Sequence, residues 1–214
     1  METSGGLLRP CYTLAVIEIE QKFAIKPGDR ERLLAGAEFV SKKIIHDAYW
    51  DTPNAILISG EAFLRNRDGK FELKIPLHKL TKELPKSYHY DEIYDEAEIR
   101  QHLGLTRPGS MPDALRRGGY DVVADFSTTR TKYQRDQFIL DFDETDFGFS
   151  LVEIERQVER DDQRKVAAKE IVEFAKGMGL ELMHVRGKIH EFIKSRRPDL
   201  WDKVKKAWEQ WPEH

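Results

Sequence analysis

The chain has 214 residues, of which 40% are hydrophobic and 34% charged, with a formal net charge of -3 and a pI of about 6.2. This length suits one large domain, and the pI gives no overall sign of nucleic-acid binding. A single cysteine, Cys11, excludes an internal disulfide and is typical of intracellular proteins. Residues 1–10 lack the apolar core of a signal peptide, and no apolar run reaches membrane-spanning length. We therefore expect a soluble, cytoplasmic protein.

Strands dominate the predicted elements of the first half. After a flexible lead-in at 1–11, apolar and acidic residues alternate at 17–20, which predicts a strand within 12–23. Asp29 follows a Pro-Gly break and is expected to cap a helix that reaches Phe39. Further strands are expected at 42–50, 55–65 and 71–77, and Asp68-Gly69 is a hairpin signal.

The second half is expected to alternate helices with longer strands. Two short helices are predicted at 95–105 and 111–117, followed by strands at 121–133, 137–143 and 149–159. Two longer helices at 163–178 and 188–210 make residues 163–211 a helical C-terminal part of one domain that spans 1–214. Many antiparallel strands with few helices favour a barrel or sandwich with packed helices.

Several of these strands place two ionisable residues at positions i and i+2, which lie on one face of a strand. These pairs are Glu18/Glu20 with Lys22, Arg65/Arg67, Glu72/Lys74, Asp141/Asp143 and Glu153/Glu155. A solvated strand face would explain any single pair. Purely acidic pairs on neighbouring strands, however, cost stability unless a cation compensates them. We expect helices to cover an apolar outer face while the charges line an interior.

The two kinds of charge suit two halves of one ligand. Carboxylates are the hard oxygen ligands that bind Mg²⁺ or Mn²⁺. Arginine and lysine suit a polyanion, and arginine grips phosphate oxygens in a bidentate manner. A site that combines both sets fits a polyphosphate bound together with a metal ion.

The order of these motifs resembles the CYTH superfamily of triphosphate tunnel metalloenzymes, and within it animal thiamine triphosphatases most closely. Glu18-Ile19-Glu20-Gln21-Lys22 matches the ExExK signature, which alone is a weak signal. The sequel makes the resemblance specific over roughly residues 16 to 200. It consists of Tyr49-Trp50-Asp51-Thr52-Pro53, Leu64-Arg65-Asn66-Arg67, Glu72-Leu73-Lys74, Tyr90-Asp91-Glu92, Thr128-Thr129-Arg130, the run from Asp141 to Gly148, Glu153-Ile154-Glu155, Gly187-Lys188 and Ser195-Arg196-Arg197-Pro198.

The resemblance implies an α+β fold: an eight-stranded antiparallel closed β-barrel that forms a triphosphate tunnel, with packed helices, two of them at the C-terminus. It implies metal ligands at Glu18, Glu20, Asp141, Glu153 and Glu155, with Glu92 as a further acidic position of uncertain role. It implies triphosphate binding by Lys22, Arg65, Arg67, Lys74, Arg130 and Lys188. Lys74 with Tyr49 corresponds to a pair that is catalytic in some members, and a lysine crowded by cations suits proton acceptance.

The implied activity is metal-dependent hydrolysis of a small-molecule triphosphate to diphosphate and phosphate, with Mg²⁺, or alternatively Mn²⁺, as cofactor. Phe63 stands where vertebrate thiamine triphosphatases have a tryptophan assigned to the organic part of the substrate. Thiamine triphosphate and inorganic tripolyphosphate therefore both stay open as substrates. Alternatives are a polyphosphate-binding module without turnover and another activity of the superfamily, such as a class IV adenylate cyclase. We expect a monomer without nucleic-acid or membrane partners.

Overall fold

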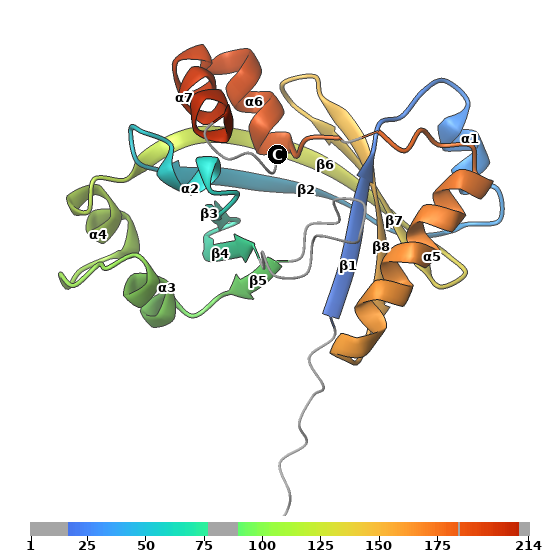
Figure 1. The fold of residues 1–214 in the computed structure, drawn as a ribbon, viewed down its shortest axis with the longest axis horizontal. Coiled ribbons are helices and arrows are strands. Elements are labelled where there is room, and N and C mark those ends of the chain that lie inside the picture. Colours follow the sequence, from blue (N-terminus) through green and yellow to red (C-terminus); the bar gives the residue numbers. More distant parts are fainter. Residues whose placement is uncertain (1–16, 77–89, 184, 210–214) are drawn as a thin grey trace, which may run out of the picture.

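The computed structural model describes residues 17–76, 90–183 and 185–209 (Figure 1). The predicted lead-in at 1–11 lies outside these ranges. The strands are β1 (Ile17–Phe23), β2 (Glu38–Asp51), β3 (Phe63–Arg67), β4 (Lys70–Pro76), β5 (Tyr90–Ile93), β6 (Asp121–Arg135), β7 (Phe138–Thr145) and β8 (Ser150–Val158). The helices are α1 (Asp29–Leu34), α2 (Ile56–Ser59), α3 (Glu96–His102), α4 (Met111–Arg117), α5 (Arg164–Gly177), α6 (Lys188–Arg196) and α7 (Pro198–Glu209), with a 3-10 turn at Asp161–Gln163.

All eight strands belong to one antiparallel sheet in the order β1-β8-β7-β6-β2-β3-β4-β5. This confirms the expected eight-stranded architecture with two C-terminal helices. The sheet is curled (Figure 1), and residues of both its end strands, β1 and β5, line the same cavity. Within the described ranges these two strands are the sheet edges: β5 is only four residues long and pairs with β4 alone. The expected closed barrel is therefore an open, curled sheet in this part of the chain.

Helix α5 covers the outer face of β1, β7 and β8. Ile19 and Ile154, which stand between the acidic residues of their strands, are buried against Ile171 of this helix. Full burial of each such side chain stabilises the fold by about 1.5–3 kcal/mol. Alternation then directs the neighbouring acids to the opposite, inner face. The predicted arrangement of covered apolar face and charged interior is confirmed here.

Helices α3, α4, α6 and α7 cover the other half of the sheet. Ile189 and Ile193 of α6, with Leu200 of α7, pack in one cluster with Phe126. Helices α3 and α4 pack on the β2–β5 part in a separate cluster with Trp50, Leu64 and Leu73. In the described ranges no helix is long and apolar enough to cross a membrane.

The predicted strand at 55–65 is wrong in its first half, where the chain forms the short helix α2. Asp51 explains the difference: its buried carboxylate accepts hydrogen bonds from the backbone N–H groups of Thr52, Leu57 and Ile58 at 2.6–3.1 Å. These bonds curl the chain back on the end of β2. Strand β3 begins only at Phe63.

Three other boundaries also differ from the predictions. Helix α1 ends at Leu34 rather than Phe39, and Gly28 rather than Asp29 is its N-cap. The predicted helix 188–210 is divided at Arg197, because Pro198 disfavours the helical conformation of the residue before it. The hairpin between β3 and β4 is confirmed: Asp68 and Gly69 both have positive φ, at 48° and 89°.

Candidate active site

A cavity of about 980 Å³, including the solvent at its mouth, lies inside the curled sheet. Its wall comes from both halves of the sheet and from the first turn of α6. The sequence-predicted site residues that line it are Glu18, Glu20, Lys22, Tyr49, Phe63, Arg65, Arg67, Lys74, Glu92, Arg130, Glu153, Glu155 and Lys188. Asp141 is the one predicted site residue outside this lining. The curled sheet thus brings nearly the whole predicted set to one hollow.

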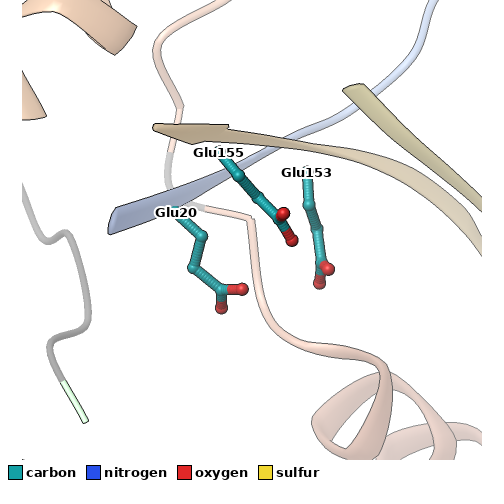
Figure 2. A group of neighbouring side chains, drawn as sticks. All are labelled: Glu20, Glu153 and Glu155. Atoms are coloured by element: carbon teal, nitrogen blue, oxygen red, sulfur yellow. The ribbon is translucent and has the colours of Figure 1, made fainter. Parts of the chain in front are cut away.

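Three carboxylates converge on one side of the cavity. Glu20 comes from β1, and Glu153 and Glu155 come from β8 (Figure 2). Each offers an oxygen atom, and these atoms lie within 4.8 Å of one another. Glu20 stands directly opposite Glu155 in the β1–β8 ladder, where two like charges are unfavourable. Because these are hard oxygen donors at short separation, the three acids fit a divalent cation such as Mg²⁺.

The two glutamates of β8 differ in their surroundings. Burial and the nearby carboxylate of Asp141 raise the pKa of Glu155 to about 8, against partial compensation by Lys132. Burial also disfavours ionised Glu153, but Lys188 and then Arg130 outweigh it and hold the pKa of Glu153 well below its ordinary value. At neutral pH the acid cluster, which consists of Glu20, Glu153 and Glu155, therefore holds a proton that a bound cation would displace.

Asp141 does not line the cavity, although it stands directly opposite Glu153 in the β7–β8 ladder. It is fully buried, and its Oδ2 atom is 2.7 Å from Nη1 of Arg130 and 3.0 Å from Nζ of Lys132. Burial raises the pKa of its carboxyl group even though both cations oppose the shift. Asp141 therefore contacts Arg130 and Lys132, whereas Glu20 and Glu155 line the cavity.

Arg130 is anchored by a second aspartate that the sequence prediction did not assign to the site. Its Nε and Nη2 atoms each donate to Asp143 at 2.7 Å, and Nη2 also donates to Glu153. The ammonium group of Lys188 contacts Asp143 as well. The i, i+2 relation of Asp143 to Asp141 was the available signal. This spacing shows that the two aspartates share one face of the strand, but it does not show which cations contact them.

The opposite wall carries a second set of paired cations. Arg67 donates to both oxygens of Asp47 at 2.8 and 2.9 Å, and Arg65 donates to Glu72 at 2.7 Å. Burial disfavours ionised Asp47, but its hydrogen bonds from Arg67 and the charge of Arg65 lower its pKa overall. These carboxylates fix the guanidinium planes before any ligand binds. Asp47 has no acidic neighbour at i+2, so no sequence pattern marked it.

Lys74 and Tyr49, the predicted catalytic pair, both line the cavity but have different partners. Nζ of Lys74 lies 2.5 Å from Glu92, and the hydroxyl of Tyr49 accepts a hydrogen bond of 3.5 Å from Arg65. Burial disfavours ionised Glu92, and Lys74 more than offsets it, so the pKa of Glu92 is lowered. Glu92 thus acts as the counter-charge of Lys74 in this structure.

One end of the cavity differs from the rest, because aromatic rings and an acid lie there beside Lys74, whose Nζ is 5.9 Å from the centroid of the Tyr90 ring. The Phe63 ring lies 5.7 Å from Tyr90 and 5.5 Å from His190 between centroids. Nε2 of His190 is 3.8 Å from Oε1 of Glu61. Neither Glu61 nor His190 was among the predicted site residues. Glu61 does stand two positions before Phe63, which was the available signal.

Comparisons with known proteins agree with this arrangement. The CYTH domain profile matches residues 16–183. The human thiamine-triphosphatase is 27% identical over 208 residues, which covers 88% of this chain and 89% of the human protein. The thiamine-triphosphatase of Macaca fascicularis is 26% identical over 207 residues, with the same coverage of both chains.

Solved structures show the same fold at low identity. A protein from Pyrococcus horikoshii OT3 aligns with a TM-score of 0.60 and 21% identity, over 84% of this chain and 99% of its own. A Hippeastrum protein, described as an adenylyl cyclase candidate with a dominant triphosphatase activity, aligns with a TM-score of 0.53 and 21% identity, over 84% and 96% of the two chains.

Proposed function

Since the chain belongs to the CYTH domain family, we propose that it is a metal-dependent triphosphatase that releases phosphate from a small-molecule triphosphate and leaves the diphosphate. One observation supports this most strongly: three convergent carboxylates and two walls of cations line the same cavity. The thiamine-triphosphatase relatives and the triphosphatase activity of the Hippeastrum protein point the same way. Thiamine triphosphate and tripolyphosphate are the proposed substrates, with Mg²⁺ as the proposed cofactor and Mn²⁺ as the alternative.

In this proposal the cations bind the triphosphate in one register. Arg65 and Arg67 reach the cavity from β3, while Lys22 and Lys188 reach it from the opposite wall. Bidentate contacts from the guanidinium groups suit phosphate oxygens. Because Asp47 and Glu72 already hold the two arginines, little reorganisation is needed when the substrate binds. Such fixed geometry is the main contribution a protein makes to phosphoryl transfer.

Glu20, Glu153 and Glu155 would hold the metal ion, with Glu18 beside them at the cavity wall. A bound divalent cation supplies neutralisation of phosphate oxygens and a more acidic water molecule. Arg130 lies between the acid cluster and Asp143, so its guanidinium group can stabilise charge that develops on the transferred phosphoryl group. We assign proton transfer to Lys74 together with Tyr49, with Glu92 orienting the lysine.

The test is a substrate panel of thiamine triphosphate, tripolyphosphate and ATP, assayed for phosphate release at fixed Mg²⁺ and without it. The proposed function predicts Mg²⁺-dependent release of one phosphate from at least one triphosphate. A protein that binds tripolyphosphate without turnover would be a binding module instead. Formation of cyclic AMP and diphosphate from ATP would assign it to the cyclases.

A further inference from the structure

The side chains that line the cavity along residues 61 to 67 change in charge from one end to the other. Four alternate positions, Glu61, Phe63, Arg65 and Arg67, all line the cavity. Three of these positions belong to β3, and Glu61 lies in the turn before it, so the wall passes from an acid to a ring and then to two cations. The two arginines thus lie at one end of this wall and Glu61 with Phe63 at the other. Lys74 stands opposite Phe63 in the β3–β4 ladder and is paired with Glu92.

Helix α6 repeats the same polarity on the facing wall. Lys188, its first residue, contacts Asp143 and lies 3.5 Å from Glu153 of the acid cluster. His190, two residues later, lies 3.8 Å from Glu61 and packs edge-on against Phe63. In both β3 and α6, therefore, the cations lie toward one end of the cavity, and Glu61 with its neighbour His190 lies toward the other.

The position of Glu61 is unfavourable for a glutamate in three ways. It is only 6% exposed, it stands among rings, and its backbone has a positive φ of 56° between α2 and β3. Left-handed backbone is unfavourable for a non-glycine residue, and a buried carboxylate adds a desolvation cost. Backbone strain at a cavity wall is a feature of functional positions. His190, itself 5% exposed, lies beside this carboxylate, with Nε2 at 3.8 Å from Oε1 of Glu61.

We propose that Glu61, positioned by His190, is a specificity-determining residue that selects organic triphosphate esters over inorganic tripolyphosphate. The inference rests on the proposed function, because it assumes that the triphosphate occupies the cationic part. The group attached to the end of that triphosphate then faces Glu61 and Phe63. Tripolyphosphate ends there in a further negative charge, which a buried carboxylate repels. A heteroaromatic group with a positive charge or N–H donors is attracted by the same carboxylate and stacks on the ring.

The experiment compares kcat/KM for thiamine triphosphate with kcat/KM for tripolyphosphate, at fixed Mg²⁺, in the wild type and in Glu61→Gln. The glutamine keeps the shape and removes the charge. We expect the ratio of ester to tripolyphosphate to fall roughly tenfold or more, because one charge at contact distance is removed from a poorly solvated site. The matched control is Glu173→Gln, which removes an exposed glutamate of α5 whose partner is Lys169. It should leave the ratio unchanged.

Two further variants keep the test decisive if Glu61→Gln folds poorly. Glu61→Asn is neutral and suits positive φ, since asparagine adopts left-handed backbone more readily. His190→Gln should shift the ratio in the same direction but less, because it only loosens the carboxylate. The inference is overturned if the wild type prefers tripolyphosphate, or if the ratio in folded Glu61 variants stays within about twofold of the wild-type ratio, a difference of only about 0.4 kcal/mol. If the wild type hydrolyses neither compound, the proposed function itself has failed.

Discussion

Replacing Arg130 with alanine should destabilise the fold as well as weaken substrate binding. Its guanidinium group lies among Asp141, Asp143 and Glu153, with three hydrogen bonds of 2.7 Å to the two aspartates. The arginine side chain is 12% exposed and both aspartate side chains are fully buried. Removal of this one cation leaves Asp141 without its largest counter-charge. Asp143 and Glu153 each lose a partner and keep their contacts with Lys188.

The magnitude follows from the burial of these partners. Breaking a buried ion pair by removing one partner costs about 3–5 kcal/mol. We expect the lower part of that range, about 3 kcal/mol, because burial already raises the pKa of Asp141 and a proton can replace part of the lost charge. Against a typical domain stability of roughly 5–15 kcal/mol, this is a large fraction.

Equilibrium unfolding in urea at pH 7 measures this cost, with the m-value as a check that the unfolded reference is unchanged. Arg30→Ala is the matched control, because Arg30 also contacts a carboxylate at 2.7 Å, that of Glu144, but both side chains are exposed. It should cost at most about 1 kcal/mol. A second test is the double variant Arg130→Met/Asp143→Asn, which should recover part of the stability lost in Arg130→Ala. The reasoning is refuted if Arg130→Ala is no more destabilising than Arg30→Ala.

Three other predictions concern the remaining charges. Because the pKa of Glu155 is raised to about 8, Mg²⁺ affinity should fall about tenfold per pH unit below pH 8 and level off above it. Calorimetry in different buffers should show that about one proton is released when Mg²⁺ binds. An affinity independent of pH from 6 to 8 would contradict this. The same raised pKa means that the folded state binds the extra proton, so the metal-free protein should lose stability as the pH rises from about 5 to 8, which thermal unfolding across that range would measure. Arg65→Ala should raise KM by roughly tenfold to a hundredfold through loss of a charge-assisted contact, and steady-state kinetics with an unchanged KM would place the triphosphate elsewhere in the cavity.

The charged interior was predictable because strand geometry has a strict period of two. Glu153 and Glu155 flank Ile154, and helices far along the chain supplied a cover for the apolar face. A family resemblance then named most of the cavity lining. The strand pattern is local in sequence, and the curled sheet confirms it. The residues that the resemblance named line one cavity, and their roles stay predictions.

Strand register, by contrast, is not written in any local pattern. The register places Glu20 opposite Glu155 and Asp141 opposite Lys132, with which it forms an ion pair. Asp47 was missed because its partner, Arg67, lies on another strand. The same holds for local structure set by distant bonds: residues 55–59 are apolar enough for a strand, yet Asp51 turns them into α2.

The most direct test of the account is Glu153→Gln/Glu155→Gln, assayed beside the wild type with the best substrate of the panel. The account places metal binding in the acid cluster and triphosphate binding in the cations of the same cavity. The double variant should therefore lose Mg²⁺-dependent phosphate release and Mn²⁺ binding measured by electron paramagnetic resonance. Calorimetry should still detect tripolyphosphate bound to the cations. Near-normal Mg²⁺-dependent turnover in a folded double variant would contradict the account, because the metal would then have to bind elsewhere.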